Sequence, residues 1–180
     1  MTKPVFPQGA SRPTLCFRQA GFADLAAMLA VVSDAQQALK AQGVDQWQNG
    51  YPNEAVLSED IAAGGAYVLL RDGLLIGTMA LLPGPEPTYQ VIDGCWLTKG
   101  PYFVIHRLAV HSRFKGAGVA ARMLEEAEKR CLREGIPSLR VDTHHDNQPM
   151  RRFLEKNGFL PCGEIRLEDG APRIGFEKIL

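Results

Sequence analysis

The segment Val104-Ile-His-Arg-Leu-Ala-Val-His-Ser-Arg-Phe-Lys-Gly-Ala-Gly-Val-Ala120 has the pattern of a buried strand, a basic glycine turn and the start of a helix. Gly116 and Gly118 have no side chains, so an anion can approach the backbone N–H groups of the turn. The helix that follows adds the positive end of its dipole, and Arg113 and Lys115 add cationic charge. This arrangement predicts a site for a cofactor that carries a pyrophosphate.

Three kinds of phosphate-binding turn have to be compared with this segment. A P-loop needs a Lys-Ser/Thr pair after its last glycine, whereas Lys115 precedes Gly116 here. A dinucleotide-binding turn needs a third glycine and lies early in a βαβ unit, whereas Val-Ala-Ala follows Gly118 late in the chain. The third kind is [Q/R]-x-x-G-x-[G/A], which Arg113 to Gly118 matches at every defined position. On these six residues alone, a plain strand-to-helix turn is an equally good interpretation.

A second segment adds the context that the turn lacks. Asn147-Gln-Pro-Met-Arg-Arg-Phe-Leu-Glu-Lys-Asn-Gly-Phe159 resembles N-x(5)-[FL]-Y-E-x-x-G-F, a signature of the GNAT acetyltransferase superfamily, whose acetyl-CoA turn has the pattern matched above. Both signatures occur in the expected order and separation. The chain therefore resembles this superfamily from about Thr14 onward, and residues 105–111 are locally similar to the serotonin N-acetyltransferases. The resemblance implies acetyl transfer from acetyl-CoA to a primary amine, with a small molecule as acceptor.

Length and composition limit the classes of protein. The chain has 180 residues, of which 46% are hydrophobic, enough for one domain with a substantial core. We expect a loose tail over residues 1–13 and a single domain over residues 14–180. A formal net charge of +0 argues against nucleic acid or a membrane as a partner. The 4 cysteines form no C-x-x-C pair, which indicates a reducing, cytoplasmic compartment. The sequence is also compatible with a homodimer.

Hydrophobic periodicity and turn residues predict a mixed α/β protein. The expected order is β-α-α-β-β-β-α-β-α-β-β, with Asp72-Gly73 as a hairpin turn. Strands are expected at 14–19, 66–71, 74–82, 102–110, 139–143, 159–163 and 173–178, and helices at 23–41, 54–63, 119–134 and 147–157. This order does not alternate, which argues against a doubly wound parallel sheet. It fits the GNAT fold, a mixed sheet that splays between two parallel strands (102–110 and 139–143) and is flanked by about four helices.

The resemblance assigns most of the cofactor site. The pyrophosphate of acetyl-CoA is expected against Arg113, Lys115, Gly116, Ala117, Gly118, Val119 and Ala120. The backbone N–H of Leu108, Ala109 or Val110 is expected to bind the oxyanion. Asn147 and Phe153 are expected along the pantetheine arm. As alternatives, Asn147 is a helix cap and Phe153 a core residue. No metal is expected, because the adjacent histidines His144 and His145 at a strand end should point to opposite faces.

His106 is the predicted general base. An imidazole has an ordinary pKa near neutrality, and strand alternation would place Val104, His106, Leu108 and Val110 on one face, directed into the splay. The position also matches a histidine that carries this role in the serotonin N-acetyltransferases. The alternative is a structural histidine inside the sheet. The second candidate is Asp142, which lies where some GNAT enzymes carry a glutamate base. Asp142 could equally be a partner that orients a histidine.

One position departs from the family pattern. The tyrosine that usually protonates the leaving thiolate is Leu154 here. Water or one of Tyr51, Tyr89 and Tyr102 is the expected substitute, because a thiol with a pKa of about 8.5 leaves tolerably well without an acid. The departure also leaves open a non-catalytic module that binds acetyl-CoA.

The acceptor is expected beside the loop over residues 43–54. Its Trp47 and Tyr51 would suit a cationic amine through cation–π contact. The alternative is that both aromatic side chains only fix the loop to the core. A second loop, which carries Glu86, Tyr89 and Trp96, is expected over the same cleft.

Overall fold

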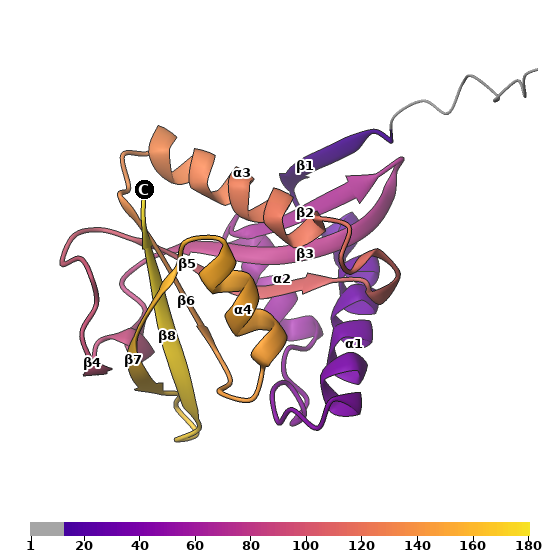
Figure 1. Ribbon diagram of the computed structural model, residues 1–180. Helices are drawn as coiled ribbons and strands as arrows, with labels where there is room; N and C mark the ends of the chain where they lie inside the picture. Colours follow the sequence, from indigo (N-terminus) through magenta and orange to yellow (C-terminus); the bar gives the residue numbers. More distant parts are fainter. Residues whose placement is uncertain (1–12) are drawn as a thin grey trace, which may run out of the picture.

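The computed structural model describes residues 13–180 and shows one mixed sheet covered by helices on both faces (Figure 1). Residues 1–12 of the expected tail lie outside this range. The sheet has eight strands in the order β1-β2-β3-β5-β6-β8-β7-β4. The strands are β1 (Leu15–Gln19), β2 (Ala66–Arg71), β3 (Leu74–Pro83), β4 (Asp93–Gly94), β5 (Phe103–Val110), β6 (Ser138–Thr143), β7 (Leu160–Arg166) and β8 (Pro172–Ile179). The α-helices are α1 (Leu25–Ala41), α2 (Glu54–Ala62), α3 (Val119–Arg133) and α4 (Gln148–Lys156).

The predicted order of elements is confirmed, with small additions. Asp72 and Gly73 have φ angles of 50° and 82°, as the predicted hairpin between β2 and β3 requires. Three short 3₁₀ helices, η1 (Phe22–Asp24), η2 (Pro87–Tyr89) and η3 (Ser112–Phe114), and the two-residue strand β4 were not predicted. Segments this short show no hydrophobic period. None of the helices within residues 13–180 combines the length and the apolar sequence that a membrane span requires.

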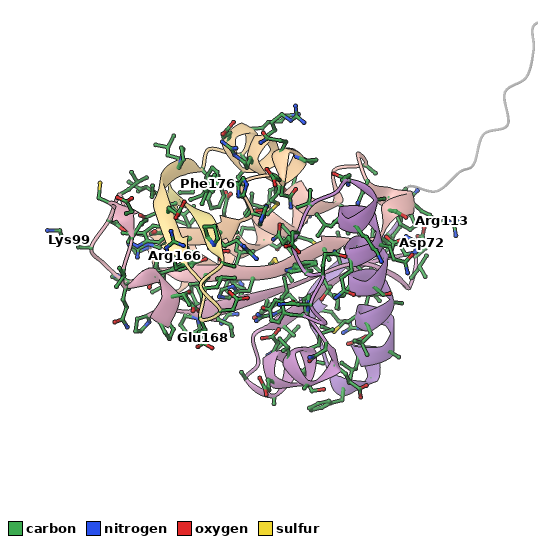
Figure 2. All side chains as sticks on the ribbon, turned by 90° about the horizontal axis from the view of Figure 1, so that it is seen from below. Asp72, Lys99, Arg113, Arg166, Glu168 and Phe176 are labelled. Carbon is green, nitrogen blue, oxygen red and sulfur yellow. The ribbon has the colours of Figure 1, made fainter. Side chains whose placement is uncertain are left out.

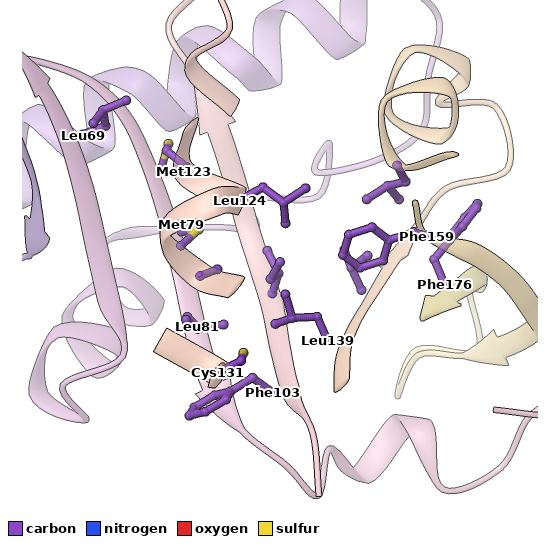
Figure 3. Packing of buried hydrophobic residues seen from close by; sticks show 14 of the residues in the cluster. Leu69, Met79, Leu81, Phe103, Met123, Leu124, Cys131, Leu139, Phe159 and Phe176 are labelled. Carbon is purple, nitrogen blue, oxygen red and sulfur yellow. The ribbon is translucent and has the colours of Figure 1, made fainter. Parts of the chain in front are cut away.

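The two pairs of helices bury opposite faces of the sheet. Helices α3 and α4 lie on one face, and α1 and α2 lie on the other (Figure 1). The larger core forms under α3 and α4, where Met123 and Leu124 of α3 lie near Leu139 of β6 and Phe159 (Figure 3). A second core lies under α1. A third, small cluster joins Tyr89 of the segment over residues 84–101 to Val104 of β5 and Ile165 of β7.

The sheet opens between β5 and β6, as predicted. These parallel strands pair at only three positions, Phe103↔Leu139, Val104↔Arg140 and Ile105↔Val141. Beyond these pairs both strands continue but diverge, as Figure 1 shows. His106 and Asp142, the two residues predicted to carry catalysis, are therefore the first residues past the last pair. The backbone of β5 beyond this point has an edge available to a ligand, because no neighbouring strand covers it.

A β-bulge in β5 corrects one prediction. Ala80 of β3 pairs with His106, but Thr78 pairs with Ala109, so two residues of β5 lie opposite one of β3. The extra residue reverses the alternation of side chains. Val104 lies in the small cluster with Tyr89, whereas Leu108 and Val110 pack on the core under α3. The prediction that Val104, His106, Leu108 and Val110 share a face was wrong, because it assumed a regular strand.

The bulge also directs Arg107 toward α2. Arg107 has a φ of 53°, in the left-handed region that a side chain rarely adopts. Its guanidinium makes two hydrogen bonds of 2.6 Å to the carboxylate of Asp60 and a third to the hydroxyl of Tyr51. Because both members of the Arg107–Asp60 pair are nearly enclosed, removing one of them would leave a buried charge unpaired. This pair therefore holds the bulge in place.

Candidate active site

The glycine turn has the geometry of an anion site. Gly116 and Gly118 both have a φ of 77°, and a Cβ atom on either would meet nothing within 4 Å. Gly118 is the N-cap of α3. Among the described residues, no backbone carbonyl accepts from the N–H groups of Gly118, Val119, Ala120 and Ala121. Four unpaired donors at a helix start, in open space, are suited to a phosphate group.

Helix α1 fixes the other end of this turn. The Asp34 carboxylate accepts hydrogen bonds from the backbone N–H of Ser112 at 2.6 Å and from its hydroxyl at 2.8 Å. Although burial acts in the opposite direction, these bonds hold the pKa of Asp34 below its ordinary value. Arg113 and Lys115 of the turn are exposed to solvent. Figure 2 shows Arg113 at one end of the molecule beside Asp72, remote from Lys99 at the other end.

His106 is held by a carboxylate that the sequence did not indicate as its partner. Its Nε2 lies 3.0 Å from Oε2 of Glu86, and both side chains are mostly enclosed. The hydrogen bond with His106 outweighs burial and holds the pKa of Glu86 below its ordinary value. An ionised Glu86 accepts from Nε2–H, which leaves Nδ1 of the neutral ring as a proton acceptor. The pair resembles the base and orienting carboxylate of a catalytic triad.

The carboxylate of Asp142 is hydrogen-bonded to a tyrosine. Oδ1 of Asp142 accepts a hydrogen bond of 2.7 Å from the hydroxyl of Tyr89, which is 2% exposed. Burial, together with the charge of Asp142, raises the pKa of Tyr89 well above its ordinary value. The hydroxyl of Tyr89 therefore stays protonated at neutral pH. The rings of Tyr89 and His106 are 6.3 Å apart, so both predicted catalytic residues and the loop residues Glu86 and Tyr89 come together at the splay.

A buried ionic cluster fixes the segment that carries Glu86 and Tyr89. Glu177 of β8 is fully buried and accepts hydrogen bonds of 2.6 Å from the N–H of Leu97 and 2.5 Å from the hydroxyl of Thr98. The guanidinium of Arg140 lies 3.3 Å from Glu177 and over the rings of Trp96 and Tyr102. These contacts could not be predicted from sequence patterns, because they join residues far apart in the chain.

The three predicted oxyanion donors differ in the direction of their backbone N–H groups. The N–H of His111, directly after β5, donates to the carbonyl of Ile76 on the β3 side. Successive N–H groups of a strand point to alternate sides, so that of Ala109 also points to β3. Those of Leu108 and Val110 point to the open gap. We therefore infer that Leu108 and Val110, rather than Ala109, can donate to an oxyanion there.

Residues at the start of α4 form a closed polar cluster. Asn147 caps the helix, since its Oδ1 accepts from the N–H of Met150 at 3.2 Å. Its Nδ2 donates to Oε1 of Gln46 at 2.9 Å, and Gln46 is itself buried. Phe153 packs against the larger core. Both residues thus fulfil the structural roles that the sequence offered as alternatives, and contact with pantetheine stays a prediction.

Leu154 stands where the family signature carries tyrosine, and it is a core residue. It is 1% exposed and belongs to the cluster under α3 and α4. Replacing Leu154 by Ala should lower the free energy of unfolding by about 2–5 kcal/mol, because the deletion leaves a cavity. Urea unfolding followed by circular dichroism measures this change. A loss below about 1 kcal/mol would contradict the burial of this side chain.

The two aromatic residues that were predicted to bind the acceptor have different surroundings. Trp47 packs against the core under α1 and borders a shallow hollow of about 190 Å³ with Gln36, Lys40 and Gly50. Tyr51 is exposed, and its hydroxyl accepts from Arg107 at 2.6 Å. Trp47 thus matches the structural alternative, and Tyr51 lies next to the bulge of β5. Contact of either residue with an acceptor stays a prediction.

The two adjacent histidines do not diverge as predicted. The rings of His144 and His145 stack with centroids 4.3 Å apart, and their nitrogens lie within 4.8 Å of a carboxylate oxygen of Asp146. The prediction was wrong because both residues follow the end of β6 and are not part of a strand. Nδ1 of His144 accepts the N–H of Asp146 at 3.2 Å. Burial lowers the pKa of His144, and the neighbouring His145 and Arg173 act in the same direction.

Comparison with known proteins agrees with this geometry. Residues 32–159 match the sequence profile of the Acetyltransferase (GNAT) family. The S-alkylcysteine N-acetyltransferase of Bacillus subtilis is 27% identical over 168 residues, 91% of this chain and 88% of that protein. The N-acetyltransferase YesJ of the same organism is 27% identical over 125 residues, 67% of this chain and 68% of that protein.

Solved structures show the same fold. A GNAT-family acetyltransferase from Streptococcus agalactiae is 32% identical, with a TM-score of 0.79 over 92% of this chain and 95% of that chain. The PaiA N-acetyltransferase of Thermoplasma acidophilum, solved with coenzyme A, has a TM-score of 0.69 at 18% identity, over 93% of this chain and 99% of that chain. The profile match covers most of the chain, and the splayed strands and glycine turn are in place. The chain therefore belongs to the GNAT acetyltransferase family and is an N-acetyltransferase.

Proposed function

We propose that this protein transfers the acetyl group of acetyl-CoA to a small primary amine by direct attack, with His106 as the general base. The observation that carries the proposal is the His106–Glu86 pair at the point where β5 and β6 separate, on the strand that leads into the anion-binding turn. The PaiA structure with coenzyme A has the same fold, which supports a CoA thioester as donor. A relative named for the acetylation of S-alkylcysteine supports a small-molecule acceptor.

The donor would lie along the open edge of β5. Its pyrophosphate would accept from the N–H groups of Gly118 to Ala121 at the start of α3, with Arg113 and Lys115 beside it. The pantetheine arm would continue into the gap as an added strand. The thioester carbonyl would then face the N–H groups of Leu108 and Val110, which can stabilise the tetrahedral oxyanion.

Proton removal would fall to Nδ1 of His106. The amine is a nucleophile only when it is neutral, so a base has to take its proton before or during attack. Glu86 holds Nε2–H and thereby selects the tautomer whose Nδ1 accepts. As the ring becomes an imidazolium, the Glu86 carboxylate stabilises its charge. No covalent enzyme intermediate is required, because the amine attacks the thioester carbonyl directly.

The leaving thiolate requires no strong acid. A thiol has a pKa of about 8.5, so it departs tolerably well as an anion. Three tyrosines were considered as the acid, and the hydroxyl of each already takes part in a hydrogen bond. Tyr89 donates to Asp142, Tyr102 accepts from the N–H of Glu86, and Tyr51 accepts from Arg107. We propose that water protonates the thiolate. Separate substitution of each tyrosine by Phe should then leave the chemical step in place.

Glu86→Gln tests the role of the carboxylate. Gln is nearly isosteric but cannot stabilise an imidazolium by charge, so kcat should fall about tenfold while KM for acetyl-CoA stays within about twofold. Thiol release under saturating acceptor measures both constants. A kcat equal to that of the parent protein would show that Glu86 does not orient the base.

An acceptor screen tests the proposed function as a whole. Thiol release from acetyl-CoA is followed across primary amines, amino acids and polyamines, beside a thermal melt with acetyl-CoA. Ligand that binds only the folded state at 100 times its Kd should stabilise the protein by about 2.7 kcal/mol. A rise in melting temperature without thiol release for any amine would favour the non-catalytic binding module instead. No rise at millimolar acetyl-CoA would contradict both functions.

A further inference from the structure

One enclosed arginine on the acceptor side of the splay has no carboxylate partner. Arg173 of β8 is 9% exposed. The other arginines with side chains this enclosed are ion-paired, Arg107 with Asp60 and Arg140 with Glu177. Within residues 13–180, no carboxylate lies within salt-bridge distance of Arg173. Its one side-chain hydrogen bond goes from Nη1 to the carbonyl of Pro172 at 2.8 Å.

Burial of this unpaired guanidinium destabilises the folded state, and its nitrogens are accessible to a ligand. A charged group removed from water without an opposite charge destabilises the folded state. In the described chain, the unpartnered side-chain atoms that are sealed from solvent are Nε of Arg140 and Nε of Arg151. The unbonded nitrogens of Arg173 are therefore in contact with solvent. A guanidinium with free N–H groups in a fork is suited to a carboxylate, which it binds with two parallel hydrogen bonds.

The register of the sheet places Arg173 on the face of the catalytic residues. Gly175 pairs with Asp142, and a Cβ atom on Gly175 would lie 2.7 Å from the ring of Trp96. Ile174 packs into the opposite core, under α3 and α4. Because side chains alternate along a strand, Arg173 shares the face of Trp96 and Tyr89.

Asp142 and Arg173 are consequently diagonal neighbours on that face, and diagonal pairs have Cα atoms about 7–8 Å apart. Despite their opposite charges they form no ion pair, since the described contacts of Asp142 include Tyr89 and not Arg173. An acidic and a basic group close together but unpaired would suit a ligand that carries both an ammonium and a carboxylate. The same face carries His106, the proposed base.

We propose that Arg173 binds the carboxylate of the acceptor, and that the acceptor is an α-amino acid or an amine with a carboxylate at similar spacing. The amine of such an acceptor would lie toward Asp142 and His106, and the carboxylate would accept from the guanidinium of Arg173. The proposal rests on the proposed function, because it names the class of acceptor for the same site. Arg173 acts as a binding residue and takes no part in proton transfer.

Matched acceptors test the proposal with the parent protein. Methionine, methioninamide and 3-(methylthio)propylamine share one side chain and differ in the carboxylate, and phenylalanine, phenylalaninamide and phenethylamine form a second set. The kcat/KM for at least one free acid should exceed that for its amide and its decarboxylated amine by about tenfold or more, since charge-assisted hydrogen bonds of this kind are strong. Equal or higher kcat/KM for the compounds without a carboxylate would overturn the proposal.

Substitution of Arg173 gives the second test. Arg173→Gln should reduce kcat/KM for the free acid by about 30- to 100-fold, mainly through KM, and for the decarboxylated amine by less than about threefold. Arg173→Lys should recover part of the loss by retaining the charge. The control is Arg166→Gln on the neighbouring strand β7 (labelled in Figure 2). The Arg166 side chain is 68% exposed, so this substitution should leave both reactions unchanged. Equal loss on both acceptors would overturn the proposal.

Binding measurements separate the ways in which this experiment can fail. Each variant is first melted with and without acetyl-CoA, and an unchanged shift shows that the fold and the donor site are intact. If the substitutions prevent folding, the two acceptor sets measured with the parent protein still test whether a carboxylate on the acceptor raises kcat/KM. If the parent protein acetylates other amines but none of these compounds, and millimolar methionine or phenylalanine with CoA gives no further rise in melting temperature, the proposal is overturned. Absence of thiol release with every amine instead contradicts the proposed function itself.

Discussion

Replacing Gly118 by Glu should abolish the acetyl-CoA-dependent rise in melting temperature. Gly118 carries the first of the free N–H groups at the start of α3, and at its φ of 77° a Cβ atom would lie in open space rather than against the protein. A glutamate there would bring bulk and negative charge to the proposed position of the phosphates. Differential scanning fluorimetry at increasing acetyl-CoA measures the effect. A shift equal to that of the parent protein would contradict the assignment of this turn.

Two control variants separate charge from backbone strain. A side chain at a positive φ costs about 1–2 kcal/mol whatever its charge. Gly118→Ala carries this strain without the charge, so it should lower stability but retain a shift. Gly135 follows the other end of α3, with a φ of 68° and no atom within 4 Å of a Cβ. Gly135→Glu should therefore reproduce the strain and the charge while leaving the acetyl-CoA shift unchanged.

Replacing His106 by Gln should lower kcat about a hundredfold and leave the affinity for acetyl-CoA nearly unchanged. General base catalysis typically contributes about 10²–10⁴-fold, and glutamine keeps a polar group beside Glu86 without accepting a proton. The acidic limb of the pH–rate profile should also flatten or move, because glutamine has no titratable group. Steady-state thiol release across pH measures both effects.

Asp142→Asn tests the competing hypothesis that Asp142 is the general base. Asp142 lies directly across the splay from His106 and holds the hydroxyl of Tyr89. The proposed mechanism predicts a smaller loss of kcat for Asp142→Asn than for His106→Gln. If Asp142→Asn shows the larger loss while His106→Gln is near the parent protein, then Asp142 is the base and His106 is structural.

The fold was largely predictable because its determinants are local in the sequence. The period of α3 and the turn residues Asp72 and Gly73 each define an element without reference to the rest of the chain. The bulge in β5 was not predictable in this way. Arg107 adopts its positive φ beside contacts to Asp60 and Tyr51, which are 47 and 56 residues away in sequence. Its residue type carries no signal for that conformation.

The positions of His106 and Asp142 in the candidate site were predictable, but the residues that contact them were not. His106 and Asp142 follow from the strand that leads into the turn and from the spacing to Asn147. Glu86 and Tyr89, by contrast, lie on a loop with no regular pattern, 20 and 53 residues from the groups that they contact. Their approach depends on Glu177 of β8 and Arg140 of β6, a buried pair that fixes the loop. Such tertiary contacts leave no period in the sequence.

The role of His106 is decided by thiol release from acetyl-CoA, measured for the parent protein and for His106→Gln with the best acceptor from the screen. We expect turnover by the parent protein, a loss of about a hundredfold in the variant, and the same acetyl-CoA-dependent rise in melting temperature for both. Equal turnover by the two proteins would contradict the assignment of His106 as the base.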